Sequence, residues 1–338
     1  MSGRLRLSVV EQSPVRQGGT GADALRETIE LAVVCERLGY ERFWVAEHHS
    51  LPGIASTSPE ILIGQIGAAT STIRVGSGGV MLPHYSAFKV AENFRMLETL
   101  FPGRVDLGLG RAPGGDRRTA LALAWPGQPH DVRAYPEQVD DLIAFLADDL
   151  PEGHPFAGLR VGPPTEGVPE VWLLGSGVDS ALLAADRGLP FSFAHFFGNA
   201  ANGPAIVDAY RKRFRPSRQL AEPRVHVAVQ VLCAPTQEEA EWHAASLAVA
   251  RLQMARGQGG TGIIPPEQAA AHVFTPEERR FLEHSGMRST VGDPRRVEDE
   301  LREIAARYAT EHLGIVTICF DFAARRRSYE LLAEAFLR

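Results

Sequence analysis

Short apolar runs rich in β-branched and aromatic residues alternate along the chain with longer runs in which apolar residues recur every three or four positions. The first pattern is typical of buried strands and the second of amphipathic helices. Helices are predicted over 24–38, 87–100 and 238–254, among others. Strands are predicted to begin near Leu5, Arg42, Ile73, Val105, Val171, Pro190, Val225 and Gly314. This regular alternation indicates parallel β/α units.

Eight β/α units in 338 residues, with no Pro/Gly-rich linker between two halves, predict one TIM (β/α)₈ barrel domain over 1–338. A doubly wound open sheet is the alternative, because the sequence does not show whether the first strand pairs with the last. Residues 256–290 are predicted to be a mobile insertion before the last β/α unit. Their Gly-rich start and the pair Pro265–Pro266 are poor core material, and loops of this length are usually functional or mobile.

The overall charge of the chain limits the partners that it can bind. The formal net charge is -6 and no sustained run of Lys and Arg occurs, so neither nucleic acid nor an anionic membrane surface is an expected partner. No apolar run approaches the roughly 18 residues of a membrane span, and the first residues lack the apolar middle of a signal peptide. Cys35, Cys233 and Cys319 lie far apart in apolar surroundings, which predicts core thiols and a cytoplasmic location.

The second predicted strand ends in Glu47, His48 and His49. In a barrel, the carboxyl ends of the strands carry the active groups. Because neighbouring side chains of an extended segment point to opposite faces, only one of the two histidines can face the barrel mouth. Adjacent histidines are also a poor pair for one metal ion, which needs ligands two apart on a strand or four apart on a helix. Hydrogen-bonded rim residues are an equally good interpretation of an isolated pair.

The third predicted strand contains Gly76, Gly78 and Gly79. Glycine weakens a strand interior, so it indicates a bulge, an unusual backbone geometry or the close approach of a ligand such as a flat ring. Tight packing of the barrel wall explains this segment equally well.

Two further loops have the character of anion sites. Arg111 follows the fourth strand beside several glycines and can contact phosphate oxygens with two nitrogens. Pro113 replaces the third glycine of a dinucleotide fingerprint, so the loop is not one. Gly175, Ser176 and Gly177 lie between the fifth strand and a helix, where open amides and the helix dipole favour a phosphate. An ordinary helix cap is the alternative role for Ser176.

Taken in order, these segments resemble the bacterial luciferase-like flavin-dependent monooxygenases. The resemblance extends over nearly the whole chain. The segments that carry it are Glu47–His49, Arg74–Gly76 leading to Leu82–Pro83, Gly103–Arg111, Gly175–Ser176, Gly188–Pro190 and Val291–Pro294.

The resemblance implies specific roles for these residues. His48 matches the catalytic base, with Glu47 either raising the basicity of an imidazole or anchoring the loop. Gly78–Gly79 matches a non-prolyl cis peptide beneath the isoalloxazine ring. Arg111 and Ser176 match positions that hold the FMN phosphate, and His195 stands where luciferase has a Trp close to the flavin. The expected cofactor-binding residues are Gly78, Gly79, Arg111, Gly175, Ser176, Gly177 and His195.

The reaction that the resemblance implies is oxygenation of a small organic substrate by O₂ and FMNH₂, with the reduced flavin supplied by a separate NAD(P)H:flavin reductase. The insertion at 256–290 would act as a lid. A homodimer is expected through the helices that follow the second and third strands. Luciferase has histidine and proline after Leu-Pro, whereas this chain has His84-Tyr85-Ser86, so light emission is not implied.

Three alternatives remain at this point. A deazaflavin coenzyme could transfer hydride without O₂ at the same phosphate loops. A metal-dependent hydrolase could use His48 or His49 with Asp321, although further converging ligands are lacking. A non-catalytic flavin-binding barrel would keep the loops without turnover. Three substrate classes are considered: long-chain aldehydes, polyketide aromatics and alkyl sulfonates. The sequence after the sixth strand contains Phe191, Phe193, Phe196 and Phe197, which either belong to the core or line an aromatic entrance to the barrel.

Overall fold

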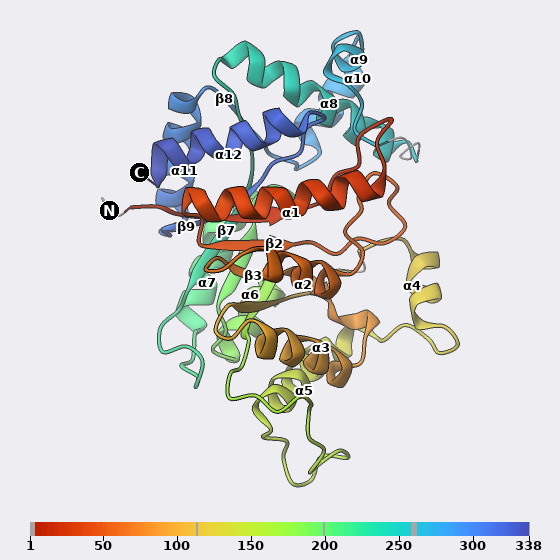
Figure 1. Cartoon of the computed structure of the whole chain (residues 1–338), viewed down its shortest axis with the longest axis vertical. Coiled ribbons are helices and arrows are strands. Elements are labelled where there is room, and N and C mark those ends of the chain that lie inside the picture. Colours follow the sequence, from red (N-terminus) through yellow and green to blue (C-terminus); the bar gives the residue numbers. More distant parts are fainter. Residues whose placement is uncertain (1–3, 113, 199, 258–261, 338) are drawn as a thin grey trace.

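Eight parallel strands close into a barrel in the computed structural model, which describes residues 4–112, 114–198, 200–257 and 262–337 (Figure 1). The barrel strands are β1 (Arg6–Glu11), β2 (Arg42–Val45), β3 (Arg74–Met81), β4 (Val105–Gly110), β5 (Glu170–Gly175), β6 (Phe191–Ala194), β7 (Val225–Cys233) and β9 (His312–Val316). β1 pairs with both β2 and β9, and β6 pairs with β7, which closes the ring. The predicted barrel is therefore confirmed, and the open sheet is excluded.

Helices surround the strands (Figure 1). They are α1 (Gly21–Leu38), α2 (Pro59–Ala69), α3 (Ala87–Leu100), α4 (Arg117–Ala124), α5 (Tyr135–Ala147), α6 (Val178–Asp186), α7 (Gly203–Arg213), α8 (Gln237–Ala255), α11 (Pro294–Tyr308) and α12 (Phe322–Phe336). α1 shows how the sequence sets the ends: Thr20 and Asp23 form a capping box, and Gly39 ends the helix at φ 91°. Short 3₁₀ turns lie at Leu82–His84, Val132–Ala134 and Ala200–Asn202.

Three elements lie in or beside the predicted insertion. They are α9 (Pro266–Ala270), α10 (Pro276–His284) and β8 (Thr290–Gly292), which adds to the outer end of β7. Residues 258–261 of the insertion lie outside the described residues. On their far side, the Ile263 amide donates to Val15 O (2.9 Å) and Ile263 O accepts from the Gln17 amide (2.8 Å). The insertion is thus attached to the loop after β1, and its mobility remains a prediction.

Large side chains fill the barrel interior. Trp44 and Trp172 lie edge to face at 5.2 Å. The inner cluster comprises Val10, Trp44, Trp172, Ala228 and Val316, with Leu174, Phe196 and Ile318 packed against it. A second, larger apolar cluster packs the outer side of the strands against the helices. Residues of odd and even position along each strand therefore separate into an inner and an outer layer.

Ion-paired side chains close the barrel where its strands begin. Asp106 is fully buried and accepts hydrogen bonds from Nη1 of Arg42 (2.7 Å), Nε1 of Trp44 (2.9 Å) and Nε of Arg74 (2.8 Å). Buried charges persist only when they are paired in this way. This network forms the floor of the barrel and leaves the carboxyl ends of the strands as its mouth.

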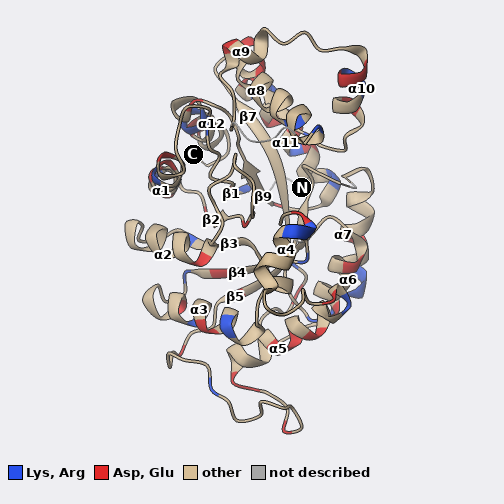
Figure 2. Ribbon diagram, turned by 90° about the vertical axis from the view of Figure 1, so that its right-hand side faces the viewer, with Lys and Arg blue, Asp and Glu red and all other residues tan. Residues whose placement is uncertain are grey.

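The outer helices carry both basic and acidic residues, and the three cysteines are buried. Basic and acidic residues are interspersed over the outer helices (Figure 2). Within the described residues, no helix is both long and apolar enough to cross a membrane. Cys35, Cys233 and Cys319 are free and buried, as predicted.

Candidate active site

Glu47 joins three segments at the mouth of the barrel. Its Oε1 accepts from the Tyr85 hydroxyl (2.6 Å) and lies 2.6 Å from Nε2 of His49, while Oε2 accepts from the Met81 amide (2.9 Å). The His49 amide in turn donates to Gly114 O (2.9 Å). Burial and the neighbouring carboxylate raise the pKa of Tyr85, so its hydroxyl stays a donor. Glu47 thereby ties the ends of β2 and β3 to the loop after β4.

The side chain of His48 forms none of these hydrogen bonds. Its backbone amide donates to Ser56 O (3.0 Å), and its Nδ1 is buried with no hydrogen-bond partner in the part of the chain that the structure describes. The ring is half-buried. Burial, and then the neighbouring His49, lower its pKa below the usual value. His48 lies three residues beyond the carboxyl end of β2, which ends at Val45. The lowered pKa favours the uncharged imidazole, and Nδ1 is left without a partner in the described structure.

Gly78 and Gly79 are joined by a cis peptide bond, as predicted. The register between β3 and β4 shifts at this point. A β-carbon on Gly79 would lie 2.6 Å from Gly108 O, so β4 leaves no room for a side chain there. A β-carbon on Gly78 would lie 3.0 Å from Cβ of Trp44, on the interior side. Close packing thus explains both glycines, since Gly79 lies against β4 and Gly78 lies against Trp44 and Val10 of the inner cluster.

The two predicted anion loops meet on one rim of the barrel. Nη1 of Arg111 lies 3.3 Å from Oδ2 of Asp179, which stands in the first turn of α6. Gly177 precedes this helix without a side-chain cap, so its first amides are open. A cavity of about 220 Å³ lies between them, lined by Arg111, Val132, Arg133, Tyr135, Pro136, Asp179, Ser180 and Leu183. Ser176 lies nearby, against Gly198 of the loop after β6.

Arg133 and Tyr135 were not predicted from the sequence. They lie at a short 3₁₀ turn and at the start of α5, in a segment without a glycine loop or a strand end. Only the fold brings this segment beside Arg111. The sequence indicates only a basic residue next to the start of a helix, and this arrangement is too common to identify a binding site.

His195 lies elsewhere than predicted. Its Nδ1 is 2.9 Å from the Tyr308 hydroxyl, and its ring packs edge to face on that of Tyr308. Phe193 contacts Tyr308 as well, which places both residues on the outer side of β6. Phe196 is the residue of this segment that joins the inner cluster. The expectation that His195 takes the place of an aromatic side chain beside the flavin therefore needs correction: alternation turns it outward, and Phe196 faces inward.

The metal-dependent alternative finds no support in the geometry. Asp321 caps α12 by accepting from the Ala324 amide (2.8 Å). Among the residues that the structure describes, no three His, Cys, Asp or Glu side chains are grouped as metal ligands.

Comparison with known proteins identifies the family. The family model described as luciferase-like monooxygenase matches residues 5–311, so the chain belongs to the luciferase-like monooxygenases. The Bacillus subtilis (strain 168) protein YwcH is 46% identical over 330 residues, which cover 98% of each chain. N-acetyl-S-alkylcysteine monooxygenase of the same strain is 37% identical over 333 residues, again 98% of each chain. The crystal structure of apo-MsnO8 superposes with a TM-score of 0.91 at 42% identity and covers 98% of each chain. The predicted enzyme class is confirmed.

Proposed function

We propose that the chain is the oxygenating component of a two-component monooxygenase. It would receive FMNH₂ from a separate NAD(P)H:flavin reductase and use O₂ to oxygenate a small organic substrate. One observation carries the proposal: Nδ1 of His48 is buried without a hydrogen-bond partner among the described residues, just beyond the carboxyl end of β2. A structural histidine would be expected to have its buried nitrogen satisfied.

The residues at the mouth fit a flavin mononucleotide. Gly78, which is only partly buried, suits the ring, because it places backbone and no side chain beside the inner cluster. Arg111 and the open amides of Gly177 and the first turn of α6 suit the phosphate, with Gly175 and Ser176 completing the loop. Bound reduced flavin would supply the activation of O₂ and the transfer of one oxygen atom.

The side chains then have separate tasks. His48 accepts a proton at Nε2, its less enclosed nitrogen, during the oxygenation. Glu47 acts as a positioning residue that fixes the end of β2 through His49, Tyr85 and the Met81 amide. Trp44, Trp172 and Phe196 exclude water from beneath the reaction.

The insertion at 256–290 is proposed to be a lid. Ile263 is hydrogen-bonded to the loop after β1, and Ile264 and Ala269 pack against Val249 of α8. Glu278 pairs with Arg256 (2.6 Å) and His272 (3.1 Å) within the insertion itself. Ion pairs within the insertion would let it move as one unit, with Arg288 and Ser289, which bond to Phe196 and Arg251, as the fixed end of the movement.

A homodimer and a cytoplasmic location complete the proposal. Ile61 of α2 and Met96 and Leu100 of α3 are 69%, 56% and 62% exposed on neighbouring helices. Large exposed apolar side chains on adjacent elements are typical of an interface. Three free thiols suit a reducing compartment.

The test is an anaerobic titration with FMNH₂ followed by mixing with O₂. Saturable binding, a transient change in flavin absorbance and peroxide release without substrate support the proposal. Candidate substrates are an N-acetyl-S-alkylcysteine, suggested by the relative of that name, and a long-chain aldehyde. A reduced deazaflavin that binds more tightly, with no oxygen consumption, would replace the proposal by hydride transfer. Flavin binding with no turnover of any reductant would favour a non-catalytic barrel.

A further inference from the structure

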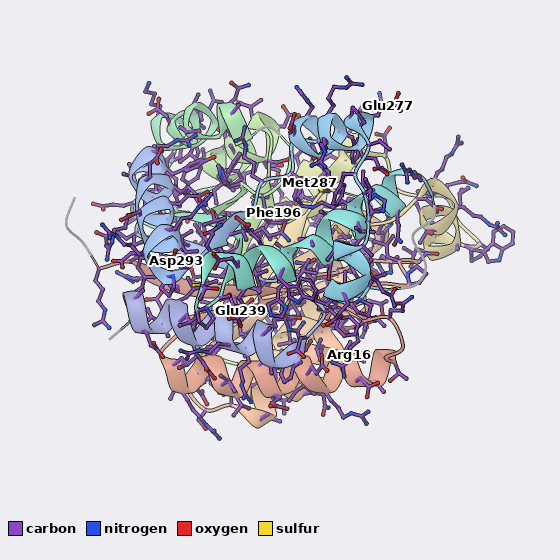
Figure 3. The ribbon with its side chains drawn as sticks, turned by 90° about the horizontal axis from the view of Figure 1, so that it is seen from above. Arg16, Phe196, Glu239, Glu277, Met287 and Asp293 are labelled. Carbon is purple, nitrogen blue, oxygen red and sulfur yellow. The ribbon has the colours of Figure 1, made fainter. Side chains whose placement is uncertain are left out.

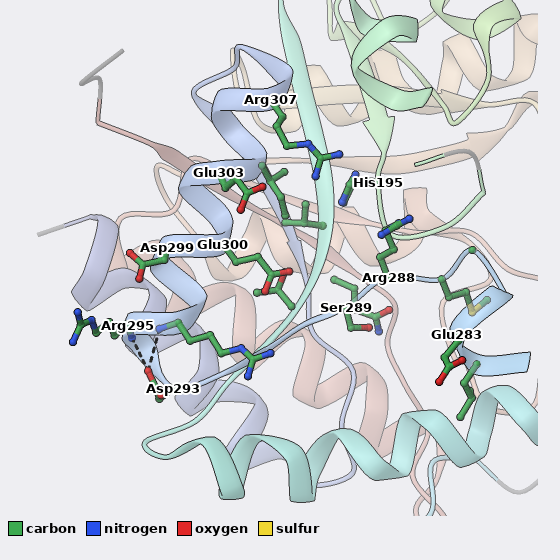
Figure 4. A pocket seen from close by; sticks show the side chains of 18 residues that line it. His195, Glu283, Arg288, Ser289, Asp293, Arg295, Asp299, Glu300, Glu303 and Arg307 are labelled. Carbon is green, nitrogen blue, oxygen red and sulfur yellow. Dashed lines mark hydrogen bonds between the residues drawn. The ribbon is translucent and has the colours of Figure 1, made fainter. Parts of the chain in front are cut away.

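A second, larger cavity lies on the outer flank of the barrel. Its volume is about 890 Å³, and it is enclosed by α11, β7 and the segment that joins α10 to β8. We call it the side cavity. His195 of the loop after β6 reaches it from the barrel wall (Figure 4). The joining segment is held to this loop, since the Arg288 amide donates to Phe196 O (3.0 Å); Figure 3 shows Phe196 and Met287 close together.

Two arginines converge at one end of the side cavity. Arg288 and Arg307 come from different elements, and both guanidinium groups lie beside His195 (Figure 4). Burial lowers the pKa of His195 to about 4, and the charges of Arg307 and Arg288 add to this effect. The same two charges act on Tyr308, whose pKa burial raises to about 12. Electrostatic influence on both groups places the two cations close to the His195–Tyr308 pair.

Neither guanidinium has a hydrogen bond or ion pair with any residue in the described ranges. Other arginines near the barrel are paired, for example Arg42 with Asp106 and Arg325 with Glu11. Glu303 stands one turn before Arg307 on α11 and lines the same cavity, yet it makes no ion pair with Arg307. Two like charges beside a buried histidine repel each other, and neither Glu303 nor Glu283, which line the same cavity, forms an ion pair with them in the described structure. A bound anion between the two guanidinium groups would offset this repulsion.

The frame around the two arginines is well fixed. The His195 amide donates to Ala228 O (2.8 Å), and Glu300 accepts from the Thr290 hydroxyl (2.8 Å), which joins α11 to β8. Arg251 of α8 binds both Gln230 and Ser289. A binding site for a ligand needs such prearranged walls.

We propose that the cationic end of the side cavity binds the carboxylate or phosphate group of a small molecule, with Arg288 and Arg307 as its charge partners. The site is separate from the barrel mouth and does not depend on the reaction proposed there. The cavity exceeds the size of a free phosphate ion. The anionic group can therefore belong to a larger organic molecule, or a free inorganic anion can occupy the cationic end alone.

The first experiment titrates the full-length protein with inorganic phosphate at constant ionic strength, by calorimetry. Saturable binding is expected, with affinity lowered about tenfold or more in Arg288→Gln and in Arg307→Gln. Glu303→Gln should bind phosphate more tightly, because it removes a competing negative charge. Arg302→Gln is the matched control: Arg302 lies on α11, is exposed and pairs with Glu298 outside the cavity. Absence of saturable binding, or equal loss in the Arg302 variant, overturns the proposal.

The second measurement follows His195 by imidazole ¹⁵N NMR. The groups around it are Arg307, Tyr308 and Glu303 of α11, Arg288 of the joining segment and Glu283 of α10. A bound anion offsets the two positive charges, so phosphate should raise the pKa of His195. An unchanged His195 titration in the presence of saturating phosphate overturns the proposal.

Competition separates the possible sources of the anion. Displacement of phosphate by FMN but not by riboflavin shows that the site accepts the phosphate of an organic ligand. Displacement by an N-acetylated amino acid shows that it accepts a carboxylate. Either result supports the proposal, as does binding of phosphate alone. These measurements require no turnover, so they succeed or fail independently of the proposed oxygenation.

Discussion

Nε2 of His49 lies 2.6 Å from Oε1 of Glu47, so the carboxylate next to two imidazoles in the sequence is committed to the second of them. The first, His48, is left without a protein partner for its buried nitrogen in the described structure. His49 therefore has the structural contact, and proton transfer is proposed for His48.

Removing the Glu47 charge should weaken this support. In Glu47→Gln the side chain keeps its size but loses the charge that binds Tyr85, His49 and the Met81 amide. The free energy of unfolding should fall by about 1–3 kcal/mol, as expected when buried hydrogen-bonding groups lose their partner. Urea denaturation measures this loss. Glu30→Gln, at an exposed position on α1, should leave stability unchanged, and a stable Glu47→Gln protein would contradict the anchoring role.

The pH dependence of oxygenation should report His48. Its pKa is lowered below the usual value of about 6.5, so the uncharged form that accepts a proton persists to more acidic pH. The single-turnover rate should therefore rise with pH through a point below 6.5 and stay level above it. His48→Asn should lower the rate by about 10²–10⁴-fold and remove this limb. In Glu47→Gln the limb should remain, because Glu47 only positions the loop. A rate limb that survives in His48→Asn would assign the base elsewhere.

A methyl group at Gly79 should disturb the barrel wall. Its β-carbon would lie 2.6 Å from Gly108 O and 2.8 Å from Gly108 C, and backbone cannot move aside as a side chain can. Gly79→Ala should destabilise the protein by about 1–3 kcal/mol or more, the usual cost of overpacking. Gly103→Ala is unsuitable as a control because Gly103 has φ 73°. Gly153→Ala is suitable, since nothing lies within 4 Å of a β-carbon there. Thermal unfolding of both variants makes the comparison.

Asp179 should compete with the flavin phosphate. It lies 3.3 Å from Arg111, at the helix start where the phosphate would bind, and its side chain is 71% exposed. Asp179→Asn removes a negative charge that repels a dianion and occupies the guanidinium. The affinity for FMN should rise several-fold while that for riboflavin, which lacks the phosphate, stays the same. Fluorescence titration with both flavins measures this. Equal effects on the two would show that Asp179 acts on the ring instead.

A charge on α3 should prevent dimerisation. Met96→Glu places a carboxylate within the exposed apolar face formed with Ile61 and Leu100, and burying that charge against a second copy is costly. Sedimentation should show a dimer for the native chain and a monomer for the variant. Val273→Glu is the control, since Val273 is 86% exposed on the insertion. An unchanged assembly in Met96→Glu would place the interface elsewhere.

The spacing of apolar residues predicted the strands of the barrel, but it did not predict the short elements that lie outside the barrel. All eight barrel strands were predicted because each buries a run of apolar residues. β8 was missed because its three residues, Thr290–Gly292, add to the end of β7 and need no apolar run of their own. α9 and α10 were missed because they pack on α8 rather than on the barrel, and their apolar faces are short.

The sequence indicates candidate site residues where strand ends carry unusual side chains, and their roles stay predictions. Glu47, His48, Arg111 and Gly78–Gly79 all lie at or near the carboxyl ends of strands, and the barrel gathers them. His195 misled because one position separates an inward from an outward side chain at the end of β6. Arg133 and Tyr135 depend on the path of the long segment after β4, which local sequence does not determine.

The closed floor has a consequence for the order of binding. Asp106 and its arginines block one end of the barrel, and the tryptophans fill the space above them. A molecule that enters the mouth can leave only by the route it came. Flavin and organic substrate would therefore enter the barrel through the same opening. The molecule that binds deeper in the barrel must bind first and be released last. Kinetics would then show a compulsory sequence of arrivals, with excess substrate slowing release of the spent flavin.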